Sequence, residues 1–177
     1  SSNPNLYRTA EGWENLKTDR QYIKVKNAPD IEIKREWTSN GPVLPTTFFD
    51  LLSITPKNHV AALSWTALTE KDTTISAAIN LMFSQNVQKG LGSLEDFHAP
   101  SLNFLLVDSE KMVLKTVGKM PRRSPLHQTQ GRMPSIGWKP ENKWRGYWGY
   151  EVNPIIESSP GDILGNTNNK ISKEEFP

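Results

Sequence analysis

Residues 104–117 contain two apolar segments of strand length that are joined by a short polar turn. The first, 104–107, reads Phe-Leu-Leu-Val, and the second, 112–117, reads Met-Val-Leu-Lys-Thr-Val. The segment between them, 108–111, has the polar sequence Asp-Ser-Glu-Lys. This pattern predicts an antiparallel β-hairpin, because the polar turn can reverse the chain between two strands. Since both faces of the hairpin would be largely apolar, we expect it to be buried at the centre of the fold.

A second hairpin is predicted nearer the N-terminus, where polar and apolar residues alternate. Residues 21–26 (Gln-Tyr-Ile-Lys-Val-Lys) and 31–37 (Ile-Glu-Ile-Lys-Arg-Glu-Trp) show the alternation of strands, and 27–30 (Asn-Ala-Pro-Asp) has turn chemistry. The charged residues predict that one side of this hairpin faces water. Residues 60–65 are expected to form a further short strand.

After the strand expected at 60–65, the apolar residues recur at the spacing of a helix. Asp72 and Thr73 provide N-cap chemistry, so we predict an amphipathic helix over 73–85. Its apolar residues at helical spacing are Ile75, Ala78, Ile79, Met82 and Phe83. A second short helix is expected within 87–97, and the chain then becomes loop-like and rich in aromatic residues after Gly118. Because helices and strands mix without a β-α-β rhythm, the sequence favours an α+β fold with antiparallel hairpins, one or two short helices and long loops.

The composition of the 177 residues is that of an ordinary globular protein. It contains no cysteine, so disulfide bonds are excluded. The formal net charge of +2 is too small to indicate nucleic-acid binding by itself. No apolar run approaches the roughly 20 residues needed to span a bilayer. We therefore expect neither a nucleic-acid partner nor a membrane span.

Basic residues are concentrated between positions 115 and 145, where Glu141 is the only acid. Such a stretch can receive an anionic group of a substrate, or it can be a solvated loop. The solvated loop is the commoner role of a charge run, and we favour it here. The basic residues are Lys115, Lys119, Arg122, Arg123, Arg132, Lys139, Lys143 and Arg145.

A series of short motifs runs along nearly the whole chain, from about Asn3 to Lys170. The motifs are Gly41-Pro42-Val43, Leu63-Ser64-Trp65-Thr66-Ala67-Leu68, Ala99-Pro100-Ser101-Leu102-Asn103-Phe104, Gly118-Lys119-Met120-Pro121-Arg122-Arg123, Pro134-Ser135-Ile136-Gly137-Trp138, Trp144-Arg145-Gly146-Tyr147, Pro160-Gly161 and Thr167-Asn168-Asn169. In order and spacing, this series resembles the penicillin amidase family of N-terminal-nucleophile (Ntn) hydrolases. The resemblance implies that residues 1–177 are a segment of the αββα acylase fold. It also implies an internal fragment of the β-subunit, without the N-terminal nucleophile strand and the C-terminal part.

The resemblance implies an activity for the parent protein rather than for the fragment. Such acylases hydrolyse the amide between an acyl group and a small amine, for example in a β-lactam or an acyl-homoserine lactone. The β-subunit begins with a serine, whose hydroxyl attacks the carbonyl while its own α-amine acts as the base. We expect this fragment to be inactive alone and to have the remainder of an α/β heterodimer as its partner. The family also implies a periplasmic or secreted location.

Ser1 and Ser2 are not expected to be the nucleophile. Ser2-Asn3 superficially copies the Ser-Asn start of the family's β-subunit. The family follows its serine with an aromatic residue and glycine-rich strands, whereas Pro4-Asn5-Leu6-Tyr7 follow here. The region therefore resembles a stretch inside the β-subunit.

Two residues match site residues of the family. Asn103 matches the asparagine whose side-chain amide donates to the tetrahedral oxyanion, and Arg123 matches an arginine close to the nucleophile. From the residues alone, a turn or capping asparagine would be the favoured role for Asn103, and the resemblance favours the oxyanion role instead. Arg123 could be a solvent-facing arginine, and a one-residue shift of the alignment would exchange it with Arg122.

The sequence departs from the family pattern in several places. Asn40 stands where a histidine is common before Gly-Pro, the hairpin turn 109–111 lacks the usual glycine and is one residue shorter, and Gly165-Asn166 replaces the common closing pattern. These departures affect what can be expected of the substrate class and the loop geometry, and they do not affect the expected fold. The pocket residues that would identify the substrate are expected elsewhere in the parent protein.

Metal binding is not expected in this segment. His59, His98 and His127 are too scattered for a metal site, and structural or surface roles are expected for them. Members of the family often bind calcium through carboxylates, but most of those ligands should lie outside this segment.

The aromatic residues from Trp138 to Tyr150 permit a different class of function, a stand-alone module that binds a sugar or a peptide. Packing within the loop is the simpler role for these aromatic residues.

Overall fold

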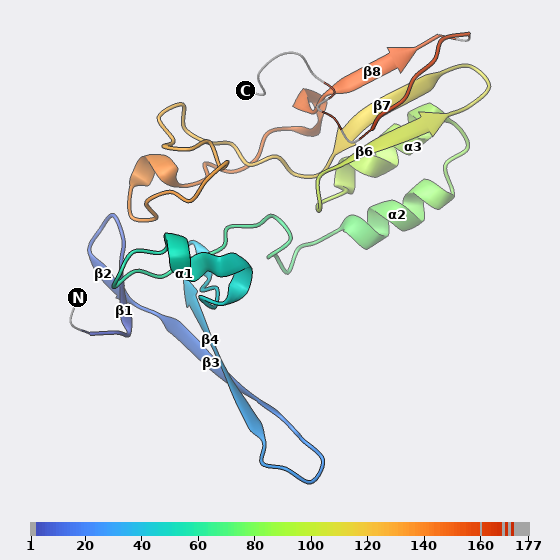
Figure 1. Ribbon diagram of the computed structural model, residues 1–177. Helices are drawn as coiled ribbons and strands as arrows, with labels where there is room; N and C mark the ends of the chain where they lie inside the picture. The colour runs from blue at the N-terminus through green and yellow to red at the C-terminus, as the bar shows by residue number, and fades with distance from the viewer. Residues whose placement is uncertain (1–2, 160, 168, 170, 172–177) are drawn as a thin grey trace. The chain divides into compact units, whose positions relative to one another are not determined.

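The computed structural model describes residues 3–159, 161–167, 169 and 171. Contacts divide the chain into two compact units (Figure 1). Unit 1 comprises residues 1–65 and 123–143, and unit 2 comprises 66–122 and 144–177. The sheets are antiparallel and are accompanied by short helices, which confirms the α+β class. Across the described residues, no helix is both long and apolar enough to cross a bilayer.

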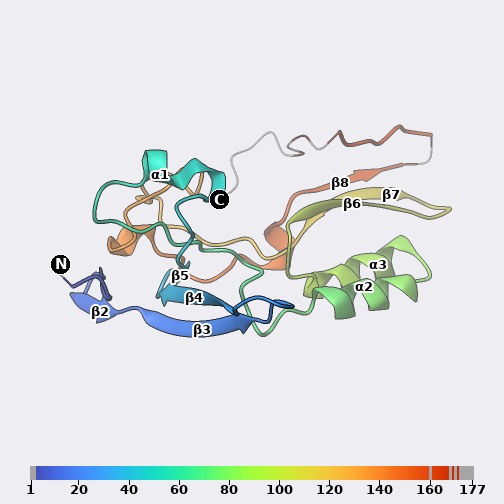
Figure 2. The same cartoon turned by 60° about the horizontal axis from the view of Figure 1, so that its bottom comes forward.

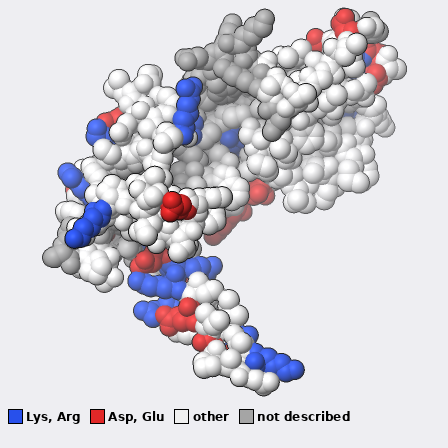
Figure 3. Space-filling view, in the orientation of Figure 1, with Lys and Arg blue, Asp and Glu red and all other residues white. Residues whose placement is uncertain are grey.

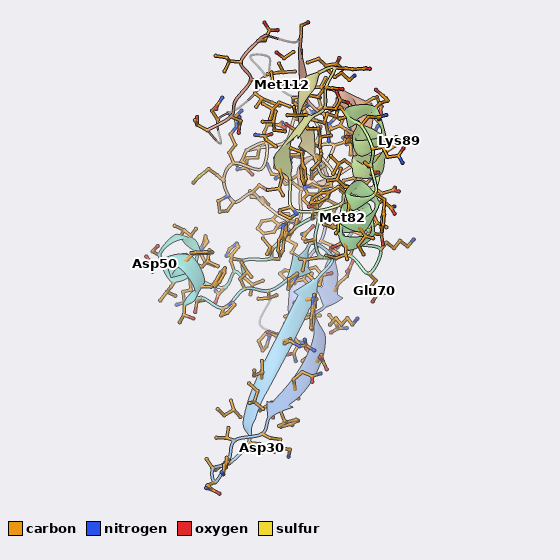
Figure 4. The ribbon with its side chains drawn as sticks, turned by 90° about the vertical axis from the view of Figure 1, so that its right-hand side faces the viewer. Asp30, Asp50, Glu70, Met82, Lys89 and Met112 are labelled. Atoms are coloured by element: carbon orange, nitrogen blue, oxygen red, sulfur yellow. The ribbon has the colours of Figure 1, made fainter. Side chains whose placement is uncertain are left out.

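The long hairpin of unit 1 consists of β3 (Lys17–Ile23) and β4 (Ile31–Thr38), paired in antiparallel register. It confirms the hairpin predicted from the alternating pattern, although β3 begins earlier than expected and ends at Ile23. Charged side chains of both signs follow this ribbon (Figure 3), and Asp30 lies at its turn (Figure 4). Arg20 pairs with Glu32 on one face, and Arg35 pairs with Asp19 on the other. Both faces therefore carry exposed charge, where only one wet face was predicted.

Shorter elements complete unit 1. β1 (Leu6–Arg8) pairs with β2 (Trp13–Asn15), and β5 (Gly41–Pro42) extends the sheet of β4. The helical turns η1 (Phe48–Asp50), α1 (Leu51–Ile54) and η3 (Pro140–Asn142) were not predicted.

The strand predicted at 60–65 is wrong. Within the described residues, this segment contributes an isolated bridge between Ala62 and Val43. Two backbone hydrogen bonds flank the bridge, from Leu63 to Pro42 and from Leu44 to Ala61. The partner segment contains Pro42 and ends at Pro45, and proline has no N–H to donate to a longer ladder.

Unit 2 is built on the predicted central hairpin. β6 (Leu102–Val107) and β7 (Met112–Val117) pair in antiparallel register, and β8 (Ile155–Ser158) joins the other side of β7. The helices α2 (Thr74–Met82) and α3 (Val87–Ser93) confirm the two predicted helices. They are followed by η2 (Leu94–Asp96), and η4 (Tyr150–Val152) precedes β8.

The core of unit 2 lies between the sheet and its helices. Val113 and Val117 of β7 are fully buried against the helical layer, together with Ala77 and Leu94. Figure 2 shows α2 and α3 on one face of the sheet, and residues 161–167 on the other. Lys89 of α3 projects away from the sheet (Figure 4).

Burial differs from the prediction at two places in unit 2. The hairpin was expected to be buried on both faces, but Leu105 and Val107 of β6 are 46% and 60% exposed. In α2, Ile75 and Met82 of the predicted apolar face are 73% and 81% exposed. The core contacts of the helix are instead made by Ala77 and Leu81, which also follow helical spacing, and Ala78 of the predicted face is partly buried. Because α2 is apolar on two sides, its periodicity could not indicate which side is buried.

Candidate active site

Asn103 is the second residue of β6 and lies directly opposite Thr116 of β7. The Thr116 hydroxyl donates to Oδ1 of Asn103 at 2.8 Å. Nδ2 of Asn103 donates to Oδ1 of Asn166 at 3.2 Å. Alternation along the strand places Asn103 and Thr116 on the sheet face opposite the helices. The predicted oxyanion donor is therefore half-buried on a paired strand rather than in a turn.

The end of the hairpin next to Asn103 is closed by tight backbone packing. Gly118 follows β7 with a φ of +98°, and a Cβ atom there would lie 2.9 Å from the Cα of Ser101. Asn153, which is buried, donates from Nδ2 to the carbonyl of Gly118 at 3.0 Å. The backbone N–H of Lys119 donates to the carbonyl of His98 at 2.8 Å. These contacts fix the strand ends that carry Asn103 and Thr116.

Lys115 is a buried cation, although its place in the basic stretch between positions 115 and 145 predicts a solvated side chain. The residue is only 4% exposed, and its ammonium donates to the carbonyl of Asn153 at 2.7 Å. The same Nζ lies 4.6 Å from the ring centroid of Tyr150. Burial lowers the pKa of Lys115, and burial raises the pKa of Tyr150 to about 12. Its position between Val113 and Val117 on the inward face was the signal that could have identified it.

The two predicted site residues belong to different units, Asn103 to unit 2 and Arg123 to unit 1. Arg123 is half-buried, and burial lowers the pKa of its guanidinium. The guanidinium lies against Gly131, where a Cβ atom would be 2.6 Å from Nη2 of Arg123. Gly131 has a φ of +78°, so both its conformation and its lack of a side chain suit this contact.

Arg122 has different surroundings. It belongs to unit 2 and is exposed, and its Nε and Nη2 donate to the carbonyl of Arg145 at 3.1 and 2.8 Å. Its guanidinium also lies 5.9 Å from the ring centroid of Trp148. The side chain of Arg122 thus fastens two segments of its own unit.

His127 organises the loop that follows Arg123. The residue is buried, and its Nδ1 accepts the backbone N–H groups of Thr129 and Gln130 at 3.2 and 3.0 Å. An imidazole nitrogen that accepts two N–H groups carries no proton, so this geometry requires the neutral ring. Burial lowers the pKa of His127, and the positive charge of Arg123 lowers it further.

We expect the His127 loop to become less stable in acid. The folded-state pKa lies below the ordinary value of about 6.5, so the unfolded chain binds the proton more tightly. The stabilisation is therefore complete above about pH 6.5 and is lost as the pH falls below it. Exchange of free amides slows as the pH falls from 7 to 5, so the measured quantity is the protection factor, the ratio of the intrinsic to the observed exchange rate. The protection factors of the Thr129 and Gln130 amides should fall over this range. His127→Asn keeps an acceptor but does not titrate, and an equal fall in this variant would contradict the assignment.

The three histidines have separate surroundings. His59 Nδ1 lies 3.0 Å from the carbonyl of Lys57, and its ring lies 5.7 Å from that of Trp138 in unit 1. His98 is buried in unit 2 with its ring 6.0 Å from that of Tyr147. In the part of the chain that the structure describes, no three side chains of the His, Asp and Glu types gather closely enough to hold a metal ion.

Comparison with known proteins identifies the family. The profile described as penicillin amidase matches residues 1–177. The chain belongs to the penicillin amidase family. Among curated relatives, it is 22% identical over 170 residues to the acyl-homoserine lactone acylase QuiP of Pseudomonas fluorescens, covering 96% of this chain and 20% of that protein. It is 24% identical over 175 residues to the penicillin acylase 2 proenzyme of a Pseudomonas species, covering 96% of this chain and 21% of that protein.

The structural comparison agrees with this family assignment. The chain resembles a thermostable penicillin G acylase from Alcaligenes faecalis with a TM-score of 0.81 and 19% sequence identity. The match covers 98% of this chain and 30% of the acylase chain. This likeness shows the acylase fold predicted from the motifs. The chain spans about a fifth of the length of the two curated relatives named above.

Proposed function

We propose that this chain is an internal β-subunit segment of an Ntn amide hydrolase that cleaves an acyl group from a small amine. The observation that carries the proposal is the orientation of the Asn103 amide. Its oxygen accepts the Thr116 hydroxyl, so its nitrogen is directed away from β7. An amide NH₂ group carries two protons, and Asn166 engages one of them. The second proton can be donated to a developing oxyanion.

The reaction requires a nucleophile from the remainder of the protein. The hydroxyl oxygen of an N-terminal serine attacks the amide carbonyl carbon, and the serine α-amine accepts the hydroxyl proton. Negative charge then develops on the former carbonyl oxygen, where the Nδ2 proton of Asn103 stabilises it. Collapse of this intermediate expels the amine, which takes up the proton, and water subsequently hydrolyses the acyl-enzyme. Asn103 contributes a hydrogen-bond donor that is already in position before the negative charge develops.

Arg123 is proposed to support the site as a permanent positive charge. Its packing against Gly131 supports this role, because a guanidinium held flat presents its donors in a fixed fork. The exposed side chain of Arg122 is already bound to the carbonyl of Arg145, which favours Arg123 over Arg122 for this role.

The names of the relatives suggest the substrate class. One is an acyl-homoserine lactone acylase and another a penicillin acylase, so linear amides of a lactone or a β-lactam are the proposed substrates. We further propose that the parent protein is periplasmic or secreted, and that any calcium it binds is held largely by ligands outside this segment. The partner of this segment is the remainder of an α/β heterodimer.

The alternative of a stand-alone binding module draws on the aromatic residues between Trp138 and Tyr150. Trp138 packs in unit 1, with the Arg8 guanidinium 5.3 Å from its ring centroid. Tyr150 packs in unit 2, where its hydroxyl donates to the carbonyl of Leu91 at 3.1 Å. These internal contacts favour a packing role over ligand binding.

Assays of the complete protein test the proposed function. We expect it to release the amine from a phenylacetyl amide or from a long-chain acyl-homoserine lactone, and the 177-residue chain alone to release none. The upstream coding sequence should contain a Ser-Asn start that becomes the N-terminus of the mature β-subunit. Absence of that start, or no turnover across a panel of linear acyl amides, would overturn the proposal.

A further inference from the structure

The side-chain amide of Asn103 belongs to a hydrogen-bonded chain that runs from the backbone carbonyl of Asn169 to the hydroxyl of Thr116. Nδ2 of Asn166 donates to the backbone carbonyl of Asn169 at 3.2 Å. A carbonyl oxygen can only accept, so the nitrogen side of the Asn166 amide must face Asn169. The oxygen of Asn166 consequently faces Asn103, where it accepts the Nδ2 proton.

Thr116 completes the chain at its other end. Because Asn166 requires a donor, Asn103 must direct its nitrogen towards Asn166 and its oxygen towards β7. The Thr116 hydroxyl can donate or accept, and it donates to that oxygen at 2.8 Å. Thr116 is itself fixed, because its backbone N–H donates to the carbonyl of Pro154 at 2.9 Å. The contact with the Asn166 oxygen thus excludes the flipped orientation of the Asn103 amide, and the hydrogen bond donated by the Thr116 hydroxyl stabilises the orientation that remains.

We propose that Thr116 and Asn166 are positioning residues that hold the Asn103 amide with its nitrogen available to the oxyanion. This inference rests on the proposed function, in which Asn103 donates to the developing charge. An amide that is free to rotate would spend part of its time with its oxygen towards the substrate, where it would repel an oxyanion. Preorganisation of the donor is what makes such stabilisation effective. Hydrogen bonding along the chain also polarises the amide and strengthens its remaining N–H as a donor.

The test compares variants of the complete protein with a linear acyl-amide substrate. Thr116→Val preserves the shape of the side chain and removes the hydroxyl. We expect kcat to fall about 3- to 10-fold, the scale of one net hydrogen bond, with KM unchanged. Thr116→Ser should restore kcat to within about twofold of the original protein, since it retains the hydroxyl. Asn166→Ala should lower kcat by a similar factor to Thr116→Val.

A double variant separates positioning from a general structural effect. Adding Thr116→Val to Asn103→Ala should cause no further loss of kcat, because the amide that Thr116 orients is already absent. An additional loss equal to that of Thr116→Val alone would overturn the positioning role. If Thr116→Val fails to fold, the comparison of Asn103→Ala with the Asn103→Ala/Asn166→Ala double variant decides by the same criterion.

The outcomes also distinguish the inference from the proposed function. A large loss in Asn103→Ala together with unchanged kcat in both Thr116→Val and Asn166→Ala would overturn the inference and leave the oxyanion role intact. Near-normal kcat in Asn103→Ala would overturn the oxyanion role and the inference with it.

Discussion

Replacing Asn103 by alanine is expected to lower kcat of the complete protein about 100- to 1000-fold, with a much smaller change in KM. The loss corresponds to roughly 2.7 to 4 kcal/mol of transition-state stabilisation, the range found for a single oxyanion donor. KM should change little because the ground-state carbonyl carries less charge than the tetrahedral intermediate. Steady-state kinetics with a chromogenic acyl amide measures both constants.

Controls for this substitution come from the same chain. Asn103→Asp replaces the donor by a carboxylate that can only accept when ionised, so it should lower kcat at least as much as Asn103→Ala. Asn80 lies exposed on α2, and Asn80→Ala should leave kcat unchanged. If Asn103→Ala retained more than a tenth of the original kcat with normal folding, Asn103 would not be an oxyanion donor.

Replacing Gly41 by alanine is expected to destabilise unit 1 by on the order of 3 to 5 kcal/mol. Gly41 has a φ of +122°, and a Cβ atom there would lie 2.0 Å from the carbonyl oxygen of Leu63. The oxygen is a backbone atom and the Cβ atom is fixed to the backbone, so neither can move aside as the end of a flexible side chain could. Leu63 is held in place because its N–H donates to the carbonyl of Pro42 at 2.9 Å. Urea unfolding followed by tryptophan fluorescence measures the loss.

Gly12 provides the matched control for Gly41. It also belongs to unit 1 and has a φ of +142°, but a Cβ atom there would meet nothing within 4 Å. Gly12→Ala should therefore show only the backbone cost of an L-residue at positive φ, about 1 to 2 kcal/mol. The difference between the two variants isolates the clash with Leu63. Equal destabilisation by both substitutions would contradict the close approach at Gly41.

The hairpins were predictable because their signals are local. In the hairpin β6–β7, residues 108–111 separate the strands, so counting outwards pairs Val107 with Met112 and Asn103 with Thr116. The contact between Asn103 and Thr116 could thus have been inferred from sequence alone. Asn166, in contrast, lies 63 residues after Asn103, and no periodicity in the sequence connects the two positions.

Predictions of burial were less successful than predictions of secondary structure. The helix α2 carries apolar residues on both sides, and the choice between them depends on which side meets the sheet. Lys115 illustrates the same difficulty, because its charge suggested solvent whereas its strand position points inwards. For Arg123, only the family motif suggested a functional role, and its contact with Gly131 depends on the fold of a loop without periodicity.

The two three-stranded sheets differ in how their outer edges resist self-association. β3 forms one edge of its sheet and carries Lys17, Asp19 and Arg20, and such charges oppose pairing with a strand of another molecule. β6 also forms an edge, but its sequence Leu-Asn-Phe-Leu-Leu-Val contains no charged residue and has the composition of aggregation-prone segments. When this segment is produced in isolation, intermolecular strand pairing will therefore begin at β6, and a charge introduced at Val107 would suppress it.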